Sequence, residues 1–103
     1  GWQVAVPACY VVKGEARVPT ISTFLGITIR MYFGDHAPPH FHAYYSDVEA
    51  VFAIETLDIV HGALPRRARN LVVEWAFEHR DELHENWRRI EAGEALMPIE
   101  PLE

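Results

Sequence analysis

Ile27-Thr28-Ile29-Arg30-Met31-Tyr32-Phe33 is followed, after six residues, by His40-Phe41-His42-Ala43-Tyr44-Tyr45. In both runs, apolar side chains alternate with polar or hydroxyl-bearing ones. A period of two predicts a β-strand with one face on the core and one face turned away from it. Gly34 and the Pro38-Pro39 pair predict a turn between the runs. The whole stretch therefore predicts a β-hairpin with a single apolar face.

Two more strands and a helix are predicted downstream. Residues 48–54 and 58–62 are short runs bounded by turn residues, which favours strands. From Pro65 onward, apolar side chains recur every three or four residues, so one long amphipathic helix is predicted over about residues 65–92, with Gly93 as a suitable stop. The expected fold class is α+β: an antiparallel four-stranded sheet, a meander, with one long C-terminal helix packed on one face.

Composition limits the classes of function. At 103 residues, the chain is long enough for one domain with a modest core. Its formal net charge of −6 opposes nucleic-acid binding unless basic side chains cluster locally. A single cysteine, Cys9, excludes an internal disulfide and a zinc site built on cysteines. No apolar run approaches the roughly 20 residues that cross a bilayer. We therefore expect a cytoplasmic protein with no membrane contact.

Residues 1–17 differ from the rest because they show no clean helical or strand period. We expect them to be upstream-encoded or vector-derived sequence, and residues 18–103 to form a single α+β domain. The alternative is that residues 4–12 add an edge strand to the sheet. Two prolines in residues 98–102 predict an extended C-terminal tail.

The polar face of the predicted hairpin carries the strongest candidates for chemistry. Strand alternation gathers a guanidinium, two imidazoles and two phenols there. An arginine can neutralise a phosphate while one imidazole acts as base and the other as acid, which suits metal-independent RNA cleavage. A tyrosine ring could stack on a base. The alternative is that such side chains are present only because they fit a pleated surface. The catalytic candidates are Arg30, Tyr32, His40 and His42, and the binding candidate is Tyr44.

The same histidines allow a metal site. His36, His40 and His42, with Asp35 beside them, could hold one Zn²⁺ or Ni²⁺ ion. No HExxH helix and no cysteine pair accompanies them. The leading interpretation therefore has no metal and no cofactor, and the metal site is the alternative.

Three arginines, Arg66, Arg67 and Arg69, open the predicted helix. A helix N-terminus attracts anions, so these side chains are candidates for binding RNA phosphate or an acidic partner. The alternative is that they pair with nearby acids such as Glu55 or Asp58.

Motifs along the chain resemble those of a known family: Pro19-Thr20-Ile21-Ser22, residues 26–33, Asp35-His36, Pro38-Pro39-His40-Phe41-His42-Ala43, Leu64-Pro65-Arg66-Arg67-Ala68, Trp75, His79-Arg80, Leu83, Asn86-Trp87 and residues 98–102. Together they resemble the bacterial family called domain of unknown function 4160, over about residues 18–102. The resemblance implies no established activity and no assigned catalytic residues. Genes of this family lie in small two-gene modules, often beside a family called domain of unknown function 2442, and this arrangement is similar to toxin–antitoxin pairs.

These observations predict a component of a two-gene, toxin–antitoxin-like module whose His/Arg/Tyr sheet face binds RNA or a partner. Its enzymatic form would be a metal-independent ribonuclease. The alternatives are a non-catalytic antitoxin or regulatory module and a metal-binding protein. The implied partner is a small protein encoded by the adjacent gene; RNA is a second candidate, and a homo-oligomer stays open.

Overall fold

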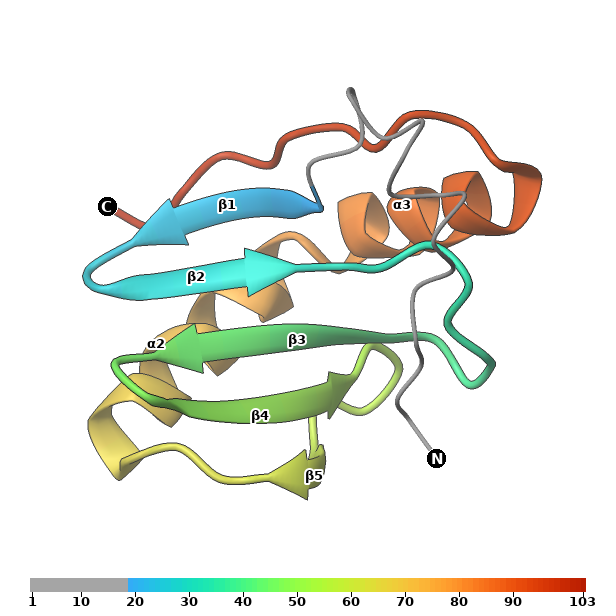
Figure 1. The fold of residues 1–103 in the computed structure, drawn as a ribbon. Helices are drawn as coiled ribbons and strands as arrows, with labels where there is room; N and C mark the ends of the chain where they lie inside the picture. Colours follow the sequence, from blue (N-terminus) through green and yellow to red (C-terminus); the bar gives the residue numbers. More distant parts are fainter. Residues whose placement is uncertain (1–18) are drawn as a thin grey trace.

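The computed structural model describes residues 19–103, which form one antiparallel sheet with two helices behind it (Figure 1). The five strands follow one another across the sheet in chain order, as a meander. The α+β class and the antiparallel sheet are confirmed. The elements are β1 (Thr20–Phe24), β2 (Ile27–Arg30), β3 (His40–Tyr45), β4 (Val48–Ala53), β5 (Ile59–Gly62), α2 (Arg66–Glu78) and α3 (Arg80–Ala92).

The prediction of four strands was wrong, because Thr20–Phe24 forms the edge strand β1. Phe24 pairs with Ile27, so the β1–β2 hairpin turns through only Leu25 and Gly26. Both turn residues have positive φ, 50° and 82° respectively. Two-residue turns of this kind usually carry asparagine or aspartate before the glycine. A leucine in that position gives no turn signal, so the hairpin was not recognised.

The prediction of one long helix was also wrong, because the helix breaks at His79. Its backbone leaves the helical region at φ −117° and ψ 24°. An unbroken helix over 65–92 would be about 40 Å long, roughly twice the length of a six-residue strand. The break gives two helices of 13 residues that both stay behind the sheet (Figure 1). Asp81 and Glu82 in the first turn of α3 suit the positive end of the new helix.

One face of the sheet and the apolar sides of both helices form the core. The predicted alternation is confirmed, because Ile27, Ile29 and Phe41 are each at most 1% exposed. Trp75 of α2 is fully buried and its ring contacts that of Phe41 at 6.0 Å between centroids. The remaining members of the buried core cluster are Ile21, Phe24, Met31, Phe33, Ala43, Ala50, Phe52, Ile54, Leu57, Ala68, Val72, Ala76, Leu83, Trp87, Ile90 and Ile99.

The C-terminal tail runs beside the edge strand β1 (Figure 1). The backbone N–H of Ile99 donates to the carbonyl of Ile21 at 2.8 Å, and the indole N–H of Trp75 donates to the carbonyl of Glu100 at 2.8 Å. Asn86 of α3 holds the tail through both the N–H and the carbonyl of Met97. The tail thus covers an edge that would otherwise present unpaired backbone groups.

Within residues 19–103, no helix is long and apolar enough to span a bilayer. The expectations for residues 1–17, including the alternative of an edge strand, lie outside the described residues.

Candidate metal centre

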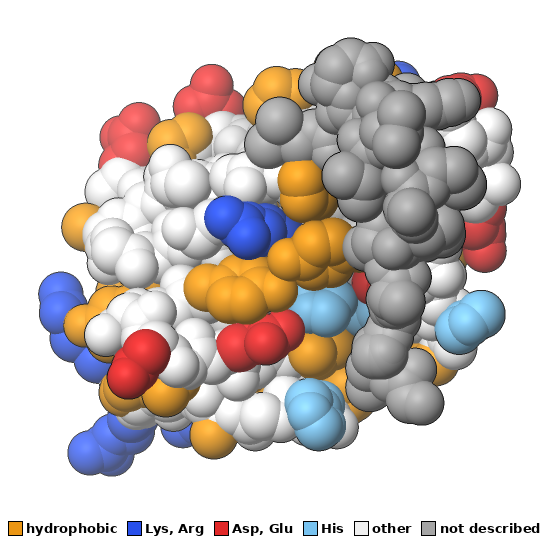
Figure 2. Space-filling model, viewed as in Figure 1, with side chains coloured by type: hydrophobic (Ala, Val, Ile, Leu, Met, Phe, Trp, Pro, Cys, Tyr) orange, Lys and Arg blue, Asp and Glu red, His pale blue; other side chains and the backbone are white. Residues whose placement is uncertain are grey.

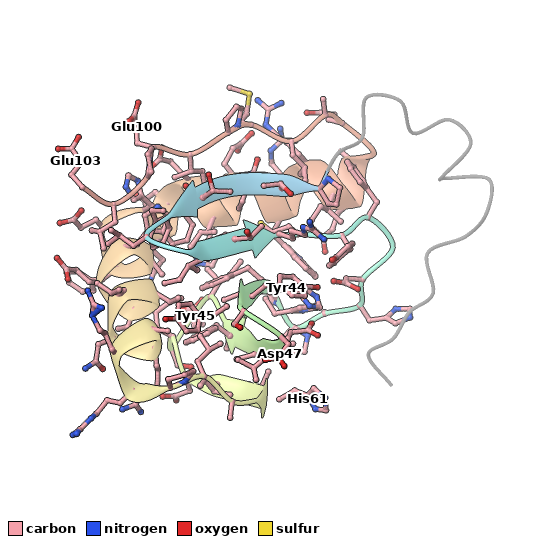
Figure 3. The ribbon with its side chains drawn as sticks, turned by 60° about the vertical axis from the view of Figure 1, so that its left-hand side comes forward. Tyr44, Tyr45, Asp47, His61, Glu100 and Glu103 are labelled. Atoms are coloured by element: carbon pink, nitrogen blue, oxygen red, sulfur yellow. The ribbon has the colours of Figure 1, made fainter. Side chains whose placement is uncertain are left out.

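The sheet face turned away from the helices carries the predicted polar side chains. Arg30 of β2 and His42 of β3 are direct partners in the ladder, as the hairpin predicts. Figure 2 shows basic, acidic and histidine side chains close together on this face. Figure 3 shows the alternation at the end of β3, where Tyr45 points toward α2 and Tyr44 points the other way.

Asp35, in the segment between β2 and β3, lies between two imidazoles. Its Oδ2 is 2.9 Å from Nε2 of His40 and 3.2 Å from Nε2 of His42. The three ligand atoms all lie within 4.8 Å of one another. The Asp35 side chain is only 4% exposed. Two nitrogens and one oxygen therefore converge on one small volume, a set that suits a divalent transition metal.

The opposite ring nitrogens of both histidines also face oxygen acceptors. Nδ1 of His40 is 2.8 Å from the carbonyl oxygen of Pro38. Nδ1 of His42 is 2.9 Å from Oε2 of Glu49 on β4. Since a carbonyl and a carboxylate only accept, each Nδ1 carries the hydrogen. Both rings therefore turn their Nε2 atoms toward Asp35 in a fixed orientation.

The histidines are buried, although the exposed strand face predicted them to face solvent. His40 is 1% exposed and His42 is 7% exposed. Trp87 of α3 packs against His40, with ring centroids 5.1 Å apart. Direct access of a large substrate to His40 would therefore require a local rearrangement.

Aromatic rings surround His42. Tyr32 meets it edge-on at 4.8 Å between centroids, and Tyr44 lies nearly parallel to it at 6.4 Å. The two tyrosine hydroxyls are hydrogen bonded to each other at 2.7 Å. The guanidinium carbon of Arg30 lies 5.3 Å from the Tyr44 ring centroid. These rings contact one another, which leaves less free ring surface for stacking on a base.

Two pKa values are shifted in opposite directions. Burial by itself lowers the pKa of His42, but hydrogen bonds and charge from Asp35 and Glu49 outweigh it and raise the pKa above 6.5. Burial by itself raises the pKa of Asp35, but hydrogen bonds and charge from His40 and His42 bring the pKa below 3.8. The contact between His42 and Asp35 thus favours the charged form of each group.

Two groups of predicted residues lie apart from the cluster. His36 is exposed and is not among the converging ligands; Asp35 stands in its place. Arg66, Arg67 and Arg69 are exposed on α2, in the helix layer. Among residues 19–103 none of these arginines forms an ion pair, so the alternative, that they pair with Glu55 or Asp58, does not hold.

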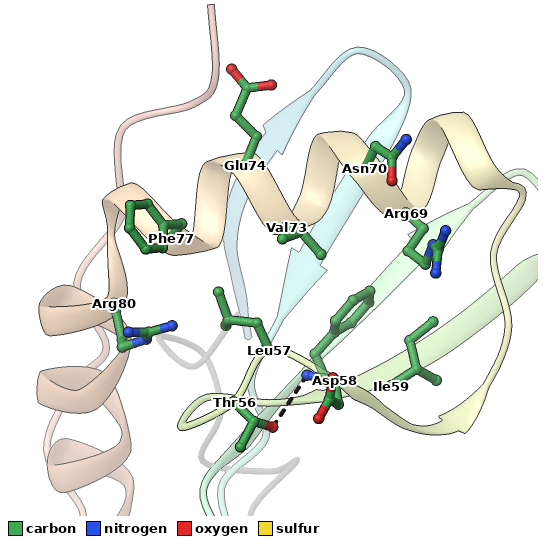
Figure 4. A pocket seen from close by; sticks show the side chains of 11 residues that line it. Thr56, Leu57, Asp58, Ile59, Arg69, Asn70, Val73, Glu74, Phe77 and Arg80 are labelled. Carbon is green, nitrogen blue, oxygen red and sulfur yellow. Dashed lines mark hydrogen bonds between the residues drawn. The ribbon is translucent and has the colours of Figure 1, made fainter.

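Arg69 lines a cavity between α2 and the segment that joins β4 to β5 (Figure 4). Arg80 lies at the other side of that cavity, and its Nε is buried with no hydrogen-bond partner among the described residues. Asp58 and Glu74 also line the cavity, so its charges are mixed.

Glu49 and Trp87 contact the cluster but were not predicted from the sequence. Glu49 pairs with Tyr44 across the β3–β4 hairpin, so it shares the polar face. The short Ser46-Asp47 turn was a usable signal for this pairing. Trp87 had no such signal, because its contact with His40 depends on where α3 packs.

Comparisons with known proteins identify a family but no close relative. Neither the search of curated proteins nor that of solved structures returned a match. A family model described as "Domain of unknown function (DUF4160)" matches residues 26–88, which include the whole His/Asp cluster and Trp87. Because this match spans more than half of the chain, the protein belongs to the DUF4160 family.

Proposed function

We propose that this protein binds a divalent transition-metal ion through Nε2 of His40, Nε2 of His42 and a carboxylate oxygen of Asp35. One observation carries the proposal: both imidazoles are anchored at Nδ1 by oxygen acceptors while both Nε2 atoms face the same carboxylate oxygen. Metal-bound histidines commonly donate their other ring N–H to a backbone carbonyl or a carboxylate, and Pro38 and Glu49 supply one of each.

The number of N–H donors on the two imidazoles, compared with the number of oxygen acceptors that they face, supports a cation at this position. All four ring nitrogens of His40 and His42 face oxygen acceptors. A neutral imidazole has only one N–H, so without a metal each ring either leaves one of its two oxygens without a hydrogen bond or takes a second proton. Two imidazolium ions at 1% and 7% exposure carry a large desolvation cost. A divalent metal replaces both protons and leaves the two Nδ1–H bonds intact.

The distances also support this donor set. Ligand atoms on a tetrahedral zinc ion are roughly 3.4 Å apart when each bond is about 2.0–2.1 Å. The Asp35 oxygen is 2.9 Å and 3.2 Å from the two imidazole nitrogens, close to this spacing, and all three atoms lie within 4.8 Å of one another. Two histidines and one carboxylate suit Zn²⁺, Co²⁺ or Ni²⁺ and leave a fourth position for water or another ligand.

Isothermal titration of metal-free protein with Zn²⁺ tests the proposal. We expect one ion per chain, and we expect His42→Gln and Asp35→Asn to lose tight binding. His36→Ala is the matched control, because His36 is an exposed histidine beside the cluster. Circular dichroism of each variant separates lost ligands from lost folding. Unchanged binding in His42→Gln, or lost binding in His36→Ala, contradicts the proposed ligands.

A metal-independent ribonuclease receives less support from this geometry. General acid–base catalysis requires an imidazole within hydrogen-bond reach of the substrate. His40 is 1% exposed, and its two ring nitrogens already face Pro38 and Asp35. In the ribonuclease mechanism, zinc-free protein would cleave RNA and His42→Gln would not; a metal requirement would argue against that mechanism.

As a second candidate, we propose that the protein acts within a two-gene, toxin–antitoxin-like module. The observation that favours it is the group of exposed arginines at the start of α2, Arg66, Arg67 and Arg69, which has no acidic partner among the described residues. Such a group suits an acidic partner protein or RNA phosphate. Co-expression with the adjacent gene product should yield a complex that weakens in Arg66→Gln/Arg67→Gln. Absence of a complex would count against this candidate.

A further inference from the structure

We propose that the metal centre takes a phosphate group as its external ligand and that Arg30 binds the phosphate oxygens that do not touch the ion. This inference rests on the proposed function, because it assigns the ligand of the fourth coordination position. The phosphate is either free or part of an ester.

Arg30 is the first line of evidence, because its guanidinium has no carboxylate partner within residues 19–103. Its Nε donates to Oγ1 of Thr20 at 3.1 Å, and no ion pair to it occurs within residues 19–103. Arg89, which is similarly half-buried, is paired with Glu85 at 3.0 Å. An arginine without a carboxylate keeps its terminal N–H groups available for the planar, bidentate contact that phosphate favours.

The position of Arg30 is the second line of evidence. Arg30 stands directly opposite His42 in the β2–β3 ladder. Opposite residues in an antiparallel pair have Cα atoms about 4.5–5.5 Å apart, and their side chains share one face. The guanidinium of Arg30 and an ion held by His42 therefore lie on the same patch of the sheet face, so one ligand can contact both.

Local charge is the third line of evidence. Although the chain carries a formal net charge of −6, the two carboxylates of Asp35 and Glu49 only balance a divalent ion. Arg30 leaves this group with one positive charge in excess. A partly buried site with excess positive charge attracts an anion, even though the net charge of the whole chain is negative.

A phosphate fits this surface better than a nucleobase does. The Tyr44 ring has the imidazole of His42 stacked beside it and the guanidinium of Arg30 over it. The Tyr32 ring is packed edge-on against His42. Because these contacts cover part of each ring, the guanidinium and the ion are the main groups left to recognise a ligand.

The test uses the full chain loaded with Co²⁺, after titration calorimetry has measured the affinity of each protein for that ion. Co²⁺ is paramagnetic, so phosphate bound to it shows a broadened ³¹P resonance. Inorganic phosphate and dimethyl phosphate are the two probes. Broadening of inorganic phosphate alone identifies a free phosphate or monoester ligand, and broadening of both identifies a diester; either result supports the inference.

Arg30→Gln should weaken phosphate binding by roughly tenfold or more without reducing Co²⁺ affinity, since charge-assisted hydrogen bonds to phosphate are lost. Arg88→Gln is the matched control, because Arg88 is an exposed arginine on α3 that is already paired with Glu85; this variant should bind phosphate as the unmodified protein does. Equal broadening in Arg30→Gln, or none in the Co²⁺-loaded unmodified protein, overturns this inference alone. If Co²⁺ does not bind, the proposed function fails and this inference fails with it.

Discussion

Glu49 on β4 accepts a hydrogen bond of 2.9 Å from Nδ1 of His42 on β3, although the two residues are two pairs apart along the ladder. This contact fixes the hydrogen on Nδ1 and turns Nε2 toward Asp35. A carboxylate in this position also makes the imidazole a stronger electron donor to a metal. Glu49 therefore orients a ligand without being one.

Glu49→Gln should lower Zn²⁺ affinity by about 10–100-fold, the usual effect of removing a residue that orients a metal ligand. The amide keeps the size of the side chain but not its charge. Titration calorimetry on metal-free protein measures the change. Asp47→Asn is the control, because Asp47 is an exposed acid in the neighbouring turn. Equal losses in both variants would indicate a general charge effect.

The pH dependence of stability should reverse when metal binds. Without metal, the raised pKa of His42 stabilises the protonated form in the folded state. This contribution is fully present below the ordinary pKa of 6.5 and is lost as pH rises through the raised value. The lowered pKa of Asp35 gives a contribution that is present above 3.8 and is lost as pH falls through the lowered value.

Urea unfolding of metal-free protein checks this prediction. The unfolding free energy of the unmodified protein should exceed that of His42→Gln most between roughly pH 4 and 6.5, with the gap closing at higher pH. With Zn²⁺ present, the gap should widen as pH rises, because metal ligands must be deprotonated. His36→Gln should follow the unmodified protein. A gap that does not vary with pH would be inconsistent with the Asp35–His42 contact.

Asn86 should be among the costliest polar residues to remove. It is 0% exposed, and its side chain bonds both the carbonyl and the N–H of Met97, at 2.9 Å and 2.8 Å. Asn86→Ala leaves both backbone groups without these partners and should lower the unfolding free energy by about 2–3 kcal/mol. Asn70→Ala, an exposed asparagine on α2, should change it by less than about 0.5 kcal/mol. Similar values for both would show that the tail is not held by Asn86.

Leu25 occupies a turn position that a leucine rarely adopts. Its φ is 50° and its side chain is 55% exposed, so little burial offsets the strain. Leu25→Asn should raise the unfolding free energy by about 0.5–1 kcal/mol, because asparagine tolerates this conformation. Thr23→Asn, at an exposed strand position, should lower it. A destabilised Leu25→Asn would contradict the β1–β2 turn.

Sequence patterns predicted the elements whose periodicity is local. The alternation in residues 27–45 predicted the hairpin, its buried face and the polar face that Arg30 and His42 share. Edge strand β1 was not predicted, because the turn at Leu25 lacks the asparagine or aspartate that usually precedes the glycine in such turns. The helix break at His79 was not predicted, because histidine does not break helices by its own chemistry. The size of the sheet on which the helices pack decides where the helix breaks.

The sequence predicted which histidines form the candidate site, but it did not predict the environment of these side chains. His40 and His42 share a face because of strand parity, which the sequence shows directly. Their burial depends on packing of elements such as α3, where Trp87 covers His40. That contact joins residues far apart in the chain, so no local pattern encodes it. The exchange of His36 for Asp35 as the third converging group likewise depends on the path of the β2–β3 segment.

The most direct test of the central claim is an anomalous difference map from crystals grown with Zn²⁺ and measured at the zinc absorption edge. The account predicts one strong peak at about 2.0–2.2 Å from Nε2 of His40, Nε2 of His42 and a carboxylate oxygen of Asp35. A map with no peak there, or with its peak at exposed His36 or His61, would contradict it.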